Sequence, residues 1–135
     1  MDQGEHARAR EPFTRLLSEF PTDFAAHYNL GSLAYEDKNW DEATRHLRTA
    51  LEIEPNNALA HFALGTVDFQ TGDLPGARDQ LSIGIKLDPK FAQAHYYLGL
   101  MLSQSGMRDD AAREFRKALE ADPKYLPALQ ALEEL

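Results

Sequence analysis

Cysteine is absent from the sequence, and several other features that would point to particular functions are missing as well. Without cysteine the chain has no disulfide bonds, no thiolate metal ligands and no thiol chemistry. No stretch approaches the roughly 18 consecutive apolar residues of a membrane-spanning helix, and the first residues lack the basic-then-apolar order of a signal peptide. We therefore expect no membrane insertion and no targeting signal, which leaves the compartment open and slightly favours the cytoplasm.

Basic residues are also scarce. The sequence has 14 Lys and Arg against 22 Asp and Glu, which gives a formal net charge of -8. Nucleic acids are usually bound by clustered basic side chains, and an acidic chain repels the phosphate backbone. We therefore expect no nucleic-acid partner. The 43% of apolar and 27% of charged residues are typical of a soluble globular chain.

Motifs that carry chemistry are missing too, including phosphate-binding loops and nucleophile elbows. His27, His61 and His95 are regularly spaced, but equivalent residues on successive helices lie about 10 Å apart, whereas ligands of one zinc ion lie about 2 Å from it. His6 and His46 have no companion at ligand spacing. The sequence therefore predicts no metal site, no cofactor, no catalytic residue and no enzymatic activity.

What the sequence does contain is a repeat with a period of 34 residues. Each unit has two amphipathic helical stretches separated by a turn, and a proline ends the second stretch. The repeating columns are His27, His61 and His95; Leu30, Leu64 and Leu98; Gly31, Gly65 and Gly99; Ala43, Ala77 and Ala111; Leu47, Leu81 and Phe115; Ala50, Gly84 and Ala118; and Pro55, Pro89 and Pro123.

This pattern resembles the tetratricopeptide repeat (TPR) family, in which an aromatic residue, Leu-Gly, a small residue, a large apolar residue and a closing proline recur within 34 residues. The resemblance implies an all-α fold, a right-handed α-solenoid of helix-turn-helix repeats. We predict first helices over 24–37, 58–71 and 92–105, and second helices over 41–54, 75–88 and 109–121. The predicted units are a half-repeat with one helix at 1–23, full repeats at 24–57, 58–91 and 92–125, and a capping helix at 126–135.

Glycine and proline mark the predicted turns and helix ends. Gly72 and Gly106 indicate turns that need a relaxed backbone, and Lys38 with the residue after it takes that place in the first repeat. Asp73 is expected to cap the helix that begins near Pro75. Pro12 is expected to interrupt the helix of the half-repeat near its start and to shorten it.

The resemblance further implies a concave face formed by the first helices of the repeats. A peptide groove is expected there, with an aromatic column at its centre, because stiff aromatic side chains dominate interface energies. Glu36 is the one formal charge expected on this face, so binding should depend weakly on salt. The expected groove residues are Tyr28, Asn29, Ser32, Tyr35, Phe62, Thr66, Phe69, Gln93, Tyr96, Tyr97 and Leu100.

Some members of this family hold a terminal carboxylate of their partner with Lys and Asn side chains. In this sequence Tyr28, Ser32, Ala63, Gln93 and Tyr97 occupy those places, so a carboxylate clamp is not expected. The leading hypothesis is an adaptor that captures a peptide segment of a protein partner in the groove.

The alternative hypothesis is a self-assembling module, in which the half-repeat and the last helix pack against other copies of the chain. We also expect that Phe62 and Tyr96 can both be changed to Glu without loss of helicity, because the resemblance places them in the groove.

Overall fold

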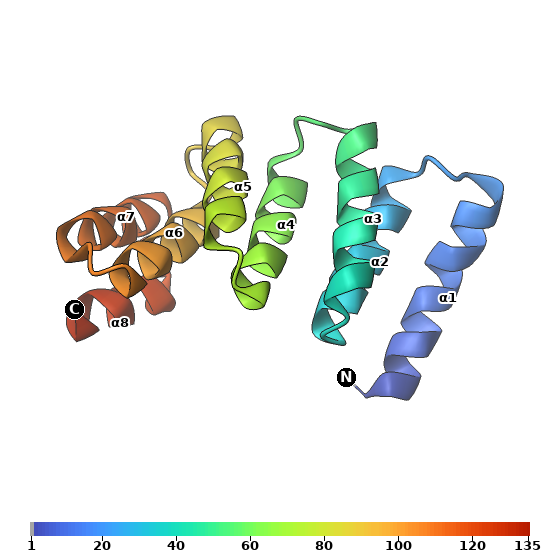
Figure 1. Cartoon of the computed structure of the whole chain (residues 1–135), viewed down its shortest axis with the longest axis horizontal. Coiled ribbons are helices and arrows are strands. Elements are labelled where there is room, and N and C mark those ends of the chain that lie inside the picture. Colours follow the sequence, from blue (N-terminus) through green and yellow to red (C-terminus); the bar gives the residue numbers. More distant parts are fainter. Residues whose placement is uncertain (1) are drawn as a thin grey trace.

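The computed structural model describes residues 2–135, which form eight α-helices and no strand. Figure 1 shows these helices as a row of antiparallel neighbours that twists along its length, with the two chain ends at opposite ends of the row. The all-α solenoid predicted from the repeat is confirmed. The helices are α1 (Gln3–Glu19), α2 (Phe24–Glu36), α3 (Trp40–Ile53), α4 (Ala58–Thr71), α5 (Leu74–Leu87), α6 (Ala92–Gln104), α7 (Arg108–Ala121) and α8 (Leu126–Glu134).

The helices α2 to α7 pair into three hairpins, and their ends differ from the predicted ones by about one residue or less. Asp73 caps α5 as predicted, because its Oδ1 accepts the backbone N–H of Gly76 at 3.0 Å. The turns within the hairpins also follow the prediction. Gly72 and Gly106 have φ values of 85° and 80°, and Lys38 takes the left-handed conformation, with φ 60°, in the first hairpin.

The helix α1 corrects one prediction, since it continues through Pro12 and spans 17 residues. Proline removes the hydrogen bond to the carbonyl four residues earlier, which here belongs to Arg8. Both residues lie on the exposed side of α1, so water can satisfy that carbonyl. The expectation that Pro12 shortens the helix is wrong because the lost hydrogen bond faces solvent.

The hairpins close on small residues that face a large buried side chain of the second helix. A Cβ atom added at Gly31 would lie 2.8 Å from Cγ of Leu47, and one at Gly99 would lie 2.5 Å from Cε1 of Phe115. Leu47 and Phe115 are each 1% exposed. Bulk at the glycine column would therefore push the two helices of a hairpin apart.

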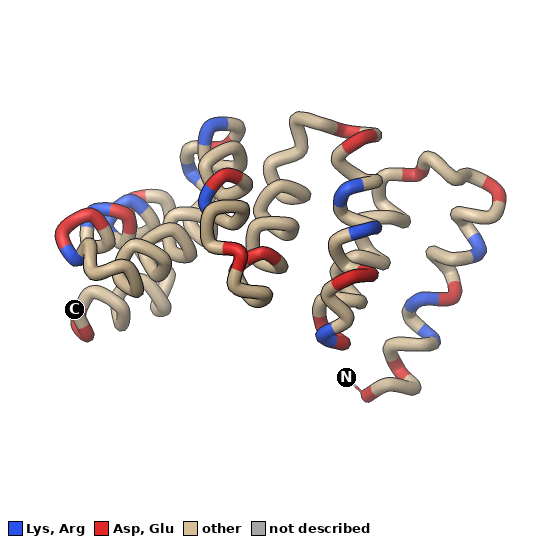
Figure 2. The backbone as a smooth tube through the Cα atoms, viewed as in Figure 1, with Lys and Arg blue, Asp and Glu red and all other residues tan. Residues whose placement is uncertain are grey.

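Charged residues are distributed unevenly between first and second helices. Figure 2 shows Lys, Arg, Asp and Glu gathered on α1, α3, α5 and α7, while α2, α4 and α6 are almost free of them. Their only charged residues are Glu36 on α2 and Asp68 on α4. Within residues 2–135, no helix is both long enough and apolar enough to cross a bilayer.

Candidate functional site

The first helices and the start of α8 enclose a cavity of about 490 Å³. The chain has five tyrosines, and every one of them lines this cavity. We call it the groove. Its lining residues are Tyr28, Ser32, Tyr35, Glu36, Leu47, Phe62, Ala63, Thr66, Gln93, Tyr96, Tyr97, Tyr125 and Pro127.

Most of the residues expected on the concave face lie together in this lining. They are Tyr28, Ser32, Tyr35, Phe62, Thr66, Gln93, Tyr96 and Tyr97.

The expected residues outside the lining are Asn29, Phe69 and Leu100. The side-chain amide of Asn29 donates a hydrogen bond to the carbonyl of Ala25 in its own helix. Phe69 packs against Tyr97, with 5.7 Å between ring centroids, and the partly buried Leu100 packs against the core formed by α7 and α8. These three side chains serve packing and local hydrogen bonding.

Tyr125 and Pro127 are lining residues that the sequence analysis missed. Tyr125 is the N-cap residue of α8 and Pro127 lies in its first turn, whereas the sequence predicts only a capping role for the helix over 126–135. A signal was present: Pro127 is the second residue after the third repeat, which is the place that the expected groove residue Gln93 holds within that repeat. Extending that correspondence into the last helix would have found Pro127.

The aromatic rings of the groove form a continuous packed wall. Tyr97 lies 5.6 Å from Phe62 and 5.6 Å from Tyr96, and Tyr96 lies 5.6 Å from Tyr125, all in edge-to-face arrangements. Phe62 also lies 4.8 Å from Phe91. Such pairs hold one another in place, so the wall is stiff.

Phe62 and Tyr96 therefore have a second role, in the core. Phe62 packs against the core shared by α5 and α6, and Tyr96 packs against the core that contains Phe115. The structure does not support the expectation that both can become Glu without loss of helicity, because the new carboxylates would be half-buried beside aromatic rings.

The groove is nearly uncharged, with Glu36 as its one ionised side chain among the described residues. Burial raises the pKa of the Tyr97 hydroxyl, and it raises the pKa of Tyr125 to about 12. Burial also raises the pKa of Tyr28, although a hydrogen bond with Ser32 opposes this. These hydroxyls stay protonated at neutral pH and offer both a donor and an acceptor.

The repeated histidines lie away from the groove and tie each hairpin to the turn before it. The Nε2 atoms of His27, His61 and His95 lie 2.8, 2.7 and 2.9 Å from the carbonyl oxygens of the prolines six residues earlier. Each Nδ1 contacts the residue 19 positions later, which is His46 at 3.1 Å, Gln80 at 2.7 Å and Glu114 at 2.8 Å. Both ring nitrogens of each repeated histidine are therefore engaged within the fold.

The sequence indicated no companion for His46, but the first hairpin brings its ring against that of His27. His6 likewise contacts Asp37, and its Nε2 lies 3.3 Å from Oε2 of Glu36. Within residues 2–135 there is no group of three or more His, Asp or Glu side chains placed to hold a metal ion.

The partners of the histidines give them different acidities. The hydrogen bond to Glu114 raises the pKa of His95 in spite of burial. Burial lowers the pKa of His46, and the neighbouring His27 lowers it further. The contact between a repeated histidine and the residue 19 positions later thus accompanies a lowered histidine pKa in the first hairpin and a raised one in the third.

Comparison with known proteins agrees with this architecture. A tetratricopeptide repeat family model matches residues 34–101, and two further models of such repeats match residues 1–58 and 92–125. The chain belongs to the tetratricopeptide repeat family. Its groove occupies the face that the first helices of TPR hairpins form. No curated protein matches the sequence significantly.

Solved TPR structures share the fold of this TPR chain. MamA superposes with a TM-score of 0.85 at 24% identity, covering 98% of this chain and 81% of MamA. YrrB, described as a TPR protein with an unusual peptide-binding site, superposes with a TM-score of 0.83 at 25% identity, over 98% of this chain and 68% of YrrB. The first TPR of Spaghetti (RPAP3), bound to the HSP90 peptide SRMEEVD, superposes with a TM-score of 0.78 at 15% identity, covering 82% of this chain and 88% of the Spaghetti domain.

Proposed function

We propose that this TPR chain is a protein-interaction scaffold that binds a peptide segment of a partner protein in the groove, and that it is not an enzyme. The observation that carries the proposal is the convergence of all five tyrosines on one cavity. Tyrosine supplies a large, stiff contact surface with a polar tip, and such residues are enriched among those that dominate binding energy.

The shape of the groove suits an extended or helical peptide. It runs across successive hairpins, with Tyr28 and Tyr35 contributed by α2, Tyr96 and Tyr97 by α6, and Tyr125 by the start of α8. Among the similar structures, YrrB is described with a peptide-binding site and the Spaghetti domain with a bound peptide. A peptide in this groove would contact side chains from all three hairpins and from α8.

The proposal can be tested with the tyrosines themselves. Peptides that bind the full chain are first selected from a displayed library of random dodecapeptides. Each selected peptide is then titrated into protein labelled with 3-fluorotyrosine and followed by ¹⁹F NMR. Because every tyrosine lines the groove, a peptide bound there should shift several of the fluorotyrosine resonances.

A pair of matched variants provides the control. Gln93 is an exposed lining residue, so Gln93→Trp should obstruct the groove and weaken binding at least about tenfold. Gln130 is exposed on α8 outside the lining, so Gln130→Trp should leave the affinity unchanged. Selected peptides that leave the fluorotyrosines unshifted and bind Gln93→Trp normally would place the binding site elsewhere and refute the proposal.

Self-assembly through the terminal helices is the second candidate function. It is supported by α8, on which Leu126 and Leu129 are 62% and 44% exposed. Apolar side chains on an end helix can pack against another copy of the chain. If this candidate holds, sedimentation should show a concentration-dependent mass that Leu126→Lys with Leu129→Lys abolishes, and a constant monomer mass would rule it out.

A further inference from the structure

The lining of the groove contains an acidic side chain but no basic one. Among residues 2–135, the lining side chains include one carboxylate, that of Glu36, and no Lys, Arg or His. The remaining polar lining groups are the five tyrosine hydroxyls, the hydroxyls of Ser32 and Thr66, and the amide of Gln93. An anionic side chain that entered the groove would meet no opposite charge, whereas a cationic one would meet Glu36.

The aromatic wall also favours a cation. The faces of tyrosine rings carry negative charge density and attract ammonium and guanidinium groups within about 6 Å. The ring of Tyr96 is inclined by 79° to that of Tyr97 and by 76° to that of Tyr125. Neighbouring rings therefore present their faces in different directions.

Helix starts near the groove could also attract an anion, because their free amides carry partial positive charge. Pro127 in the first turn of α8 has no N–H. The amides of Ala128 and Leu129 are already bonded to the carbonyl of Tyr125, at 3.2 and 3.4 Å. The corresponding amides of α6 bond to the carbonyl of Phe91 in the same way. These helix starts therefore do not reverse the preference set by Glu36 and the tyrosines.

We propose that the groove selects a peptide segment carrying a lysine or arginine, whose cationic side chain lies among the tyrosines with Glu36 as its counter-charge. This inference rests on the proposed function, since it names the chemistry of the peptide. The formal net charge of -8 favours the approach of a basic segment from solution. Glu36 is exposed, and Nε2 of His6 on α1 lies 3.3 Å from its Oε2.

The test uses the peptides selected for the full chain, which should be enriched in Lys and Arg relative to the unselected library. Each groove-binding peptide is synthesised again with arginine replaced by citrulline, or lysine by acetyl-lysine, which removes the charge and retains most of the shape. The neutral form should bind about tenfold more weakly, the scale of a cation–aromatic contact aided by one ion pair.

Two protein variants separate the role of Glu36 from a general effect of charge. Glu36→Gln should narrow the affinity difference between the charged and neutral peptides, because the counter-charge is lost. Glu134→Gln removes one exposed carboxylate at the end of α8, outside the lining, and should leave that difference unchanged. An equal effect of both variants would show that net charge alone, and not Glu36, sets the preference.

The outcomes distinguish this inference from the proposed function. Peptides that shift the fluorotyrosines but are acidic or uncharged, or that bind equally well as citrulline forms, would overturn the cation preference and leave the groove as the binding site. Peptides that leave the fluorotyrosines unshifted would instead refute the proposed function itself.

Discussion

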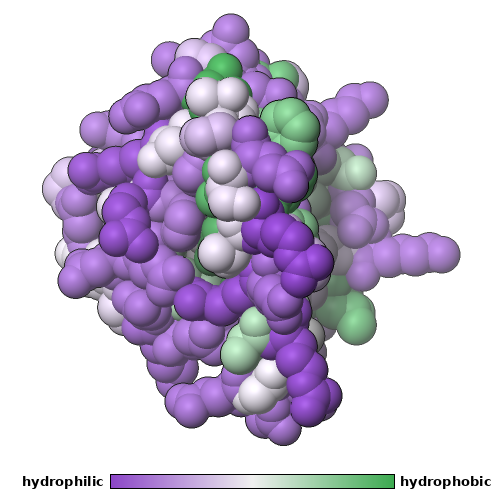
Figure 3. All heavy atoms as spheres, turned by 90° about the vertical axis from the view of Figure 1, so that its right-hand side faces the viewer, coloured by the Kyte–Doolittle hydropathy of each residue, from purple (hydrophilic) through white to green (hydrophobic). Residues whose placement is uncertain are grey.

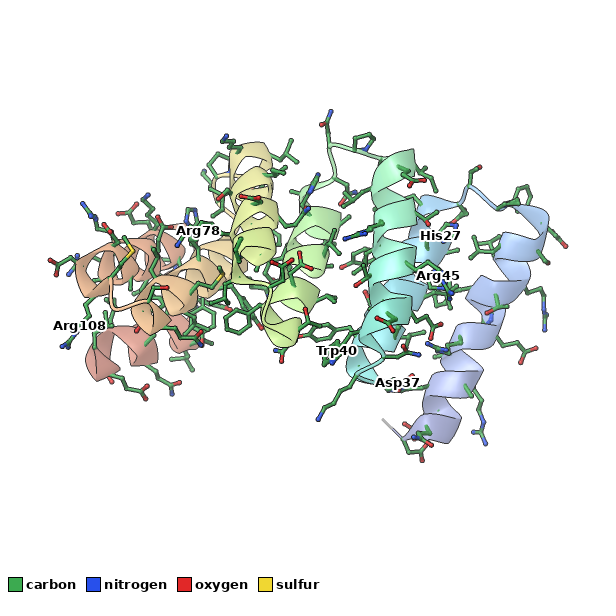
Figure 4. All side chains as sticks on the ribbon, in the orientation of Figure 1. His27, Asp37, Trp40, Arg45, Arg78 and Arg108 are labelled. Carbon is green, nitrogen blue, oxygen red and sulfur yellow. The ribbon has the colours of Figure 1, made fainter. Side chains whose placement is uncertain are left out.

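The two ends of the solenoid are joined to its middle by different side-chain chemistry. At the N-terminal end, α1 lies against α2 and α3 through charged groups. Nη2 of Arg10 lies 2.9 Å from Oε2 of Glu42, and its Nε lies 3.8 Å from Oδ2 of Asp37, which His6 also contacts. Figure 4 places Asp37 at the end of α2, on the side that faces α1. Figure 3, which looks onto the α1 end, shows a mostly hydrophilic surface with a narrow hydrophobic band.

At the C-terminal end, α7 and α8 pack on α6 through aromatic rings. Tyr96 lies 5.9 Å from Phe115 and 5.6 Å from Tyr125. Phe115 is 1% exposed, and Ala118 beside it on α7 is fully buried. This end therefore depends on apolar burial and close packing, which salt affects little.

The geometry of the repeats is the same along the chain, whereas the side chains that join each end helix to its neighbours differ between the two ends. Small residues and left-handed turns set how each hairpin closes, and they are similar throughout the chain. The side chains between hairpins and at the ends determine how each end responds to bulk, salt and pH. Substitutions at the glycine columns and at Arg10, and a change of pH, test this difference.

Bulk at the close helix contact should damage the C-terminal hairpin most. In Gly99→Ala the new Cβ would lie 2.5 Å from the ring of Phe115, which cannot bend away. We expect a loss of about 2 kcal/mol in the free energy of unfolding, measured by urea denaturation. In Gly65→Ala the nearest atom is 3.2 Å away, on the flexible side chain of Leu81, so the loss should be smaller. Equal losses would show that ring rigidity does not matter.

The middle hairpin should gain stability from a single methyl group. A Cβ at Gly84 would lie 3.4 Å from the carbonyl of Ala58, an ordinary contact, and the neighbouring hairpins have Ala50 and Ala118 at this position. Gly84→Ala should therefore raise the free energy of unfolding by about 1 kcal/mol, through helix propensity. A lower melting temperature for Gly84→Ala would mean that the contact with Ala58 is too close.

Loss of the N-terminal ion pairs should release α1 alone. Arg10→Ala should increase hydrogen exchange of the α1 amides and leave exchange in α7 unchanged. The increase should correspond to a loss of about 1 kcal/mol or less in the free energy of local unfolding of α1, because the ion pairs are partly exposed. High salt should reduce the difference from wild type, since it screens the same pairs. Arg15 pairs with Glu11 within α1, so Arg15→Ala is the matched control. Faster exchange in α7 would argue against separate ends.

Acidification should affect the first and third hairpins in opposite directions. The pKa of His95 in the folded state is raised above 6.5. Its contribution to the stability of the fold is therefore fully present below pH 6.5 and is lost as the pH rises through the folded pKa. The folded pKa of His46 is lowered, so protonation from pH 6.5 downward favours unfolding. Lowering the pH from about 7.5 to 5.5 should therefore raise the hydrogen-exchange protection factors of the α6 and α7 amides and lower those of the α2 and α3 amides, each taken relative to the intrinsic exchange rate at that pH.

The middle hairpin provides the reference for this titration, because Gln80 replaces the titrating partner there. His46→Gln and Glu114→Gln copy that arrangement into the first and third hairpins. Each variant should remove the pH response of its own hairpin and leave the other unchanged. A response that survives both changes would have to come from other groups.

The sequence alone determined the helices, their ends, the turns and the pairing into hairpins. These features depend on local signals, such as the capping side chain of Asp73 and the glycines at 72 and 106, and on a period that repeats the same short pattern. The resemblance to TPR repeats that the sequence carries also implied most of the residues that line the groove.

Tertiary structure alone decided which side chains from separate helices meet. Tyr125 enters the groove because the start of α8 packs on α6, where its ring meets that of Tyr96, and the repeat pattern did not indicate that contact. The contact of His27 with His46 and the opposite acidities of the histidines depend equally on partners brought together by packing. Local propensity fixes the elements, whereas burial and charge at the site depend on every neighbour that the fold supplies.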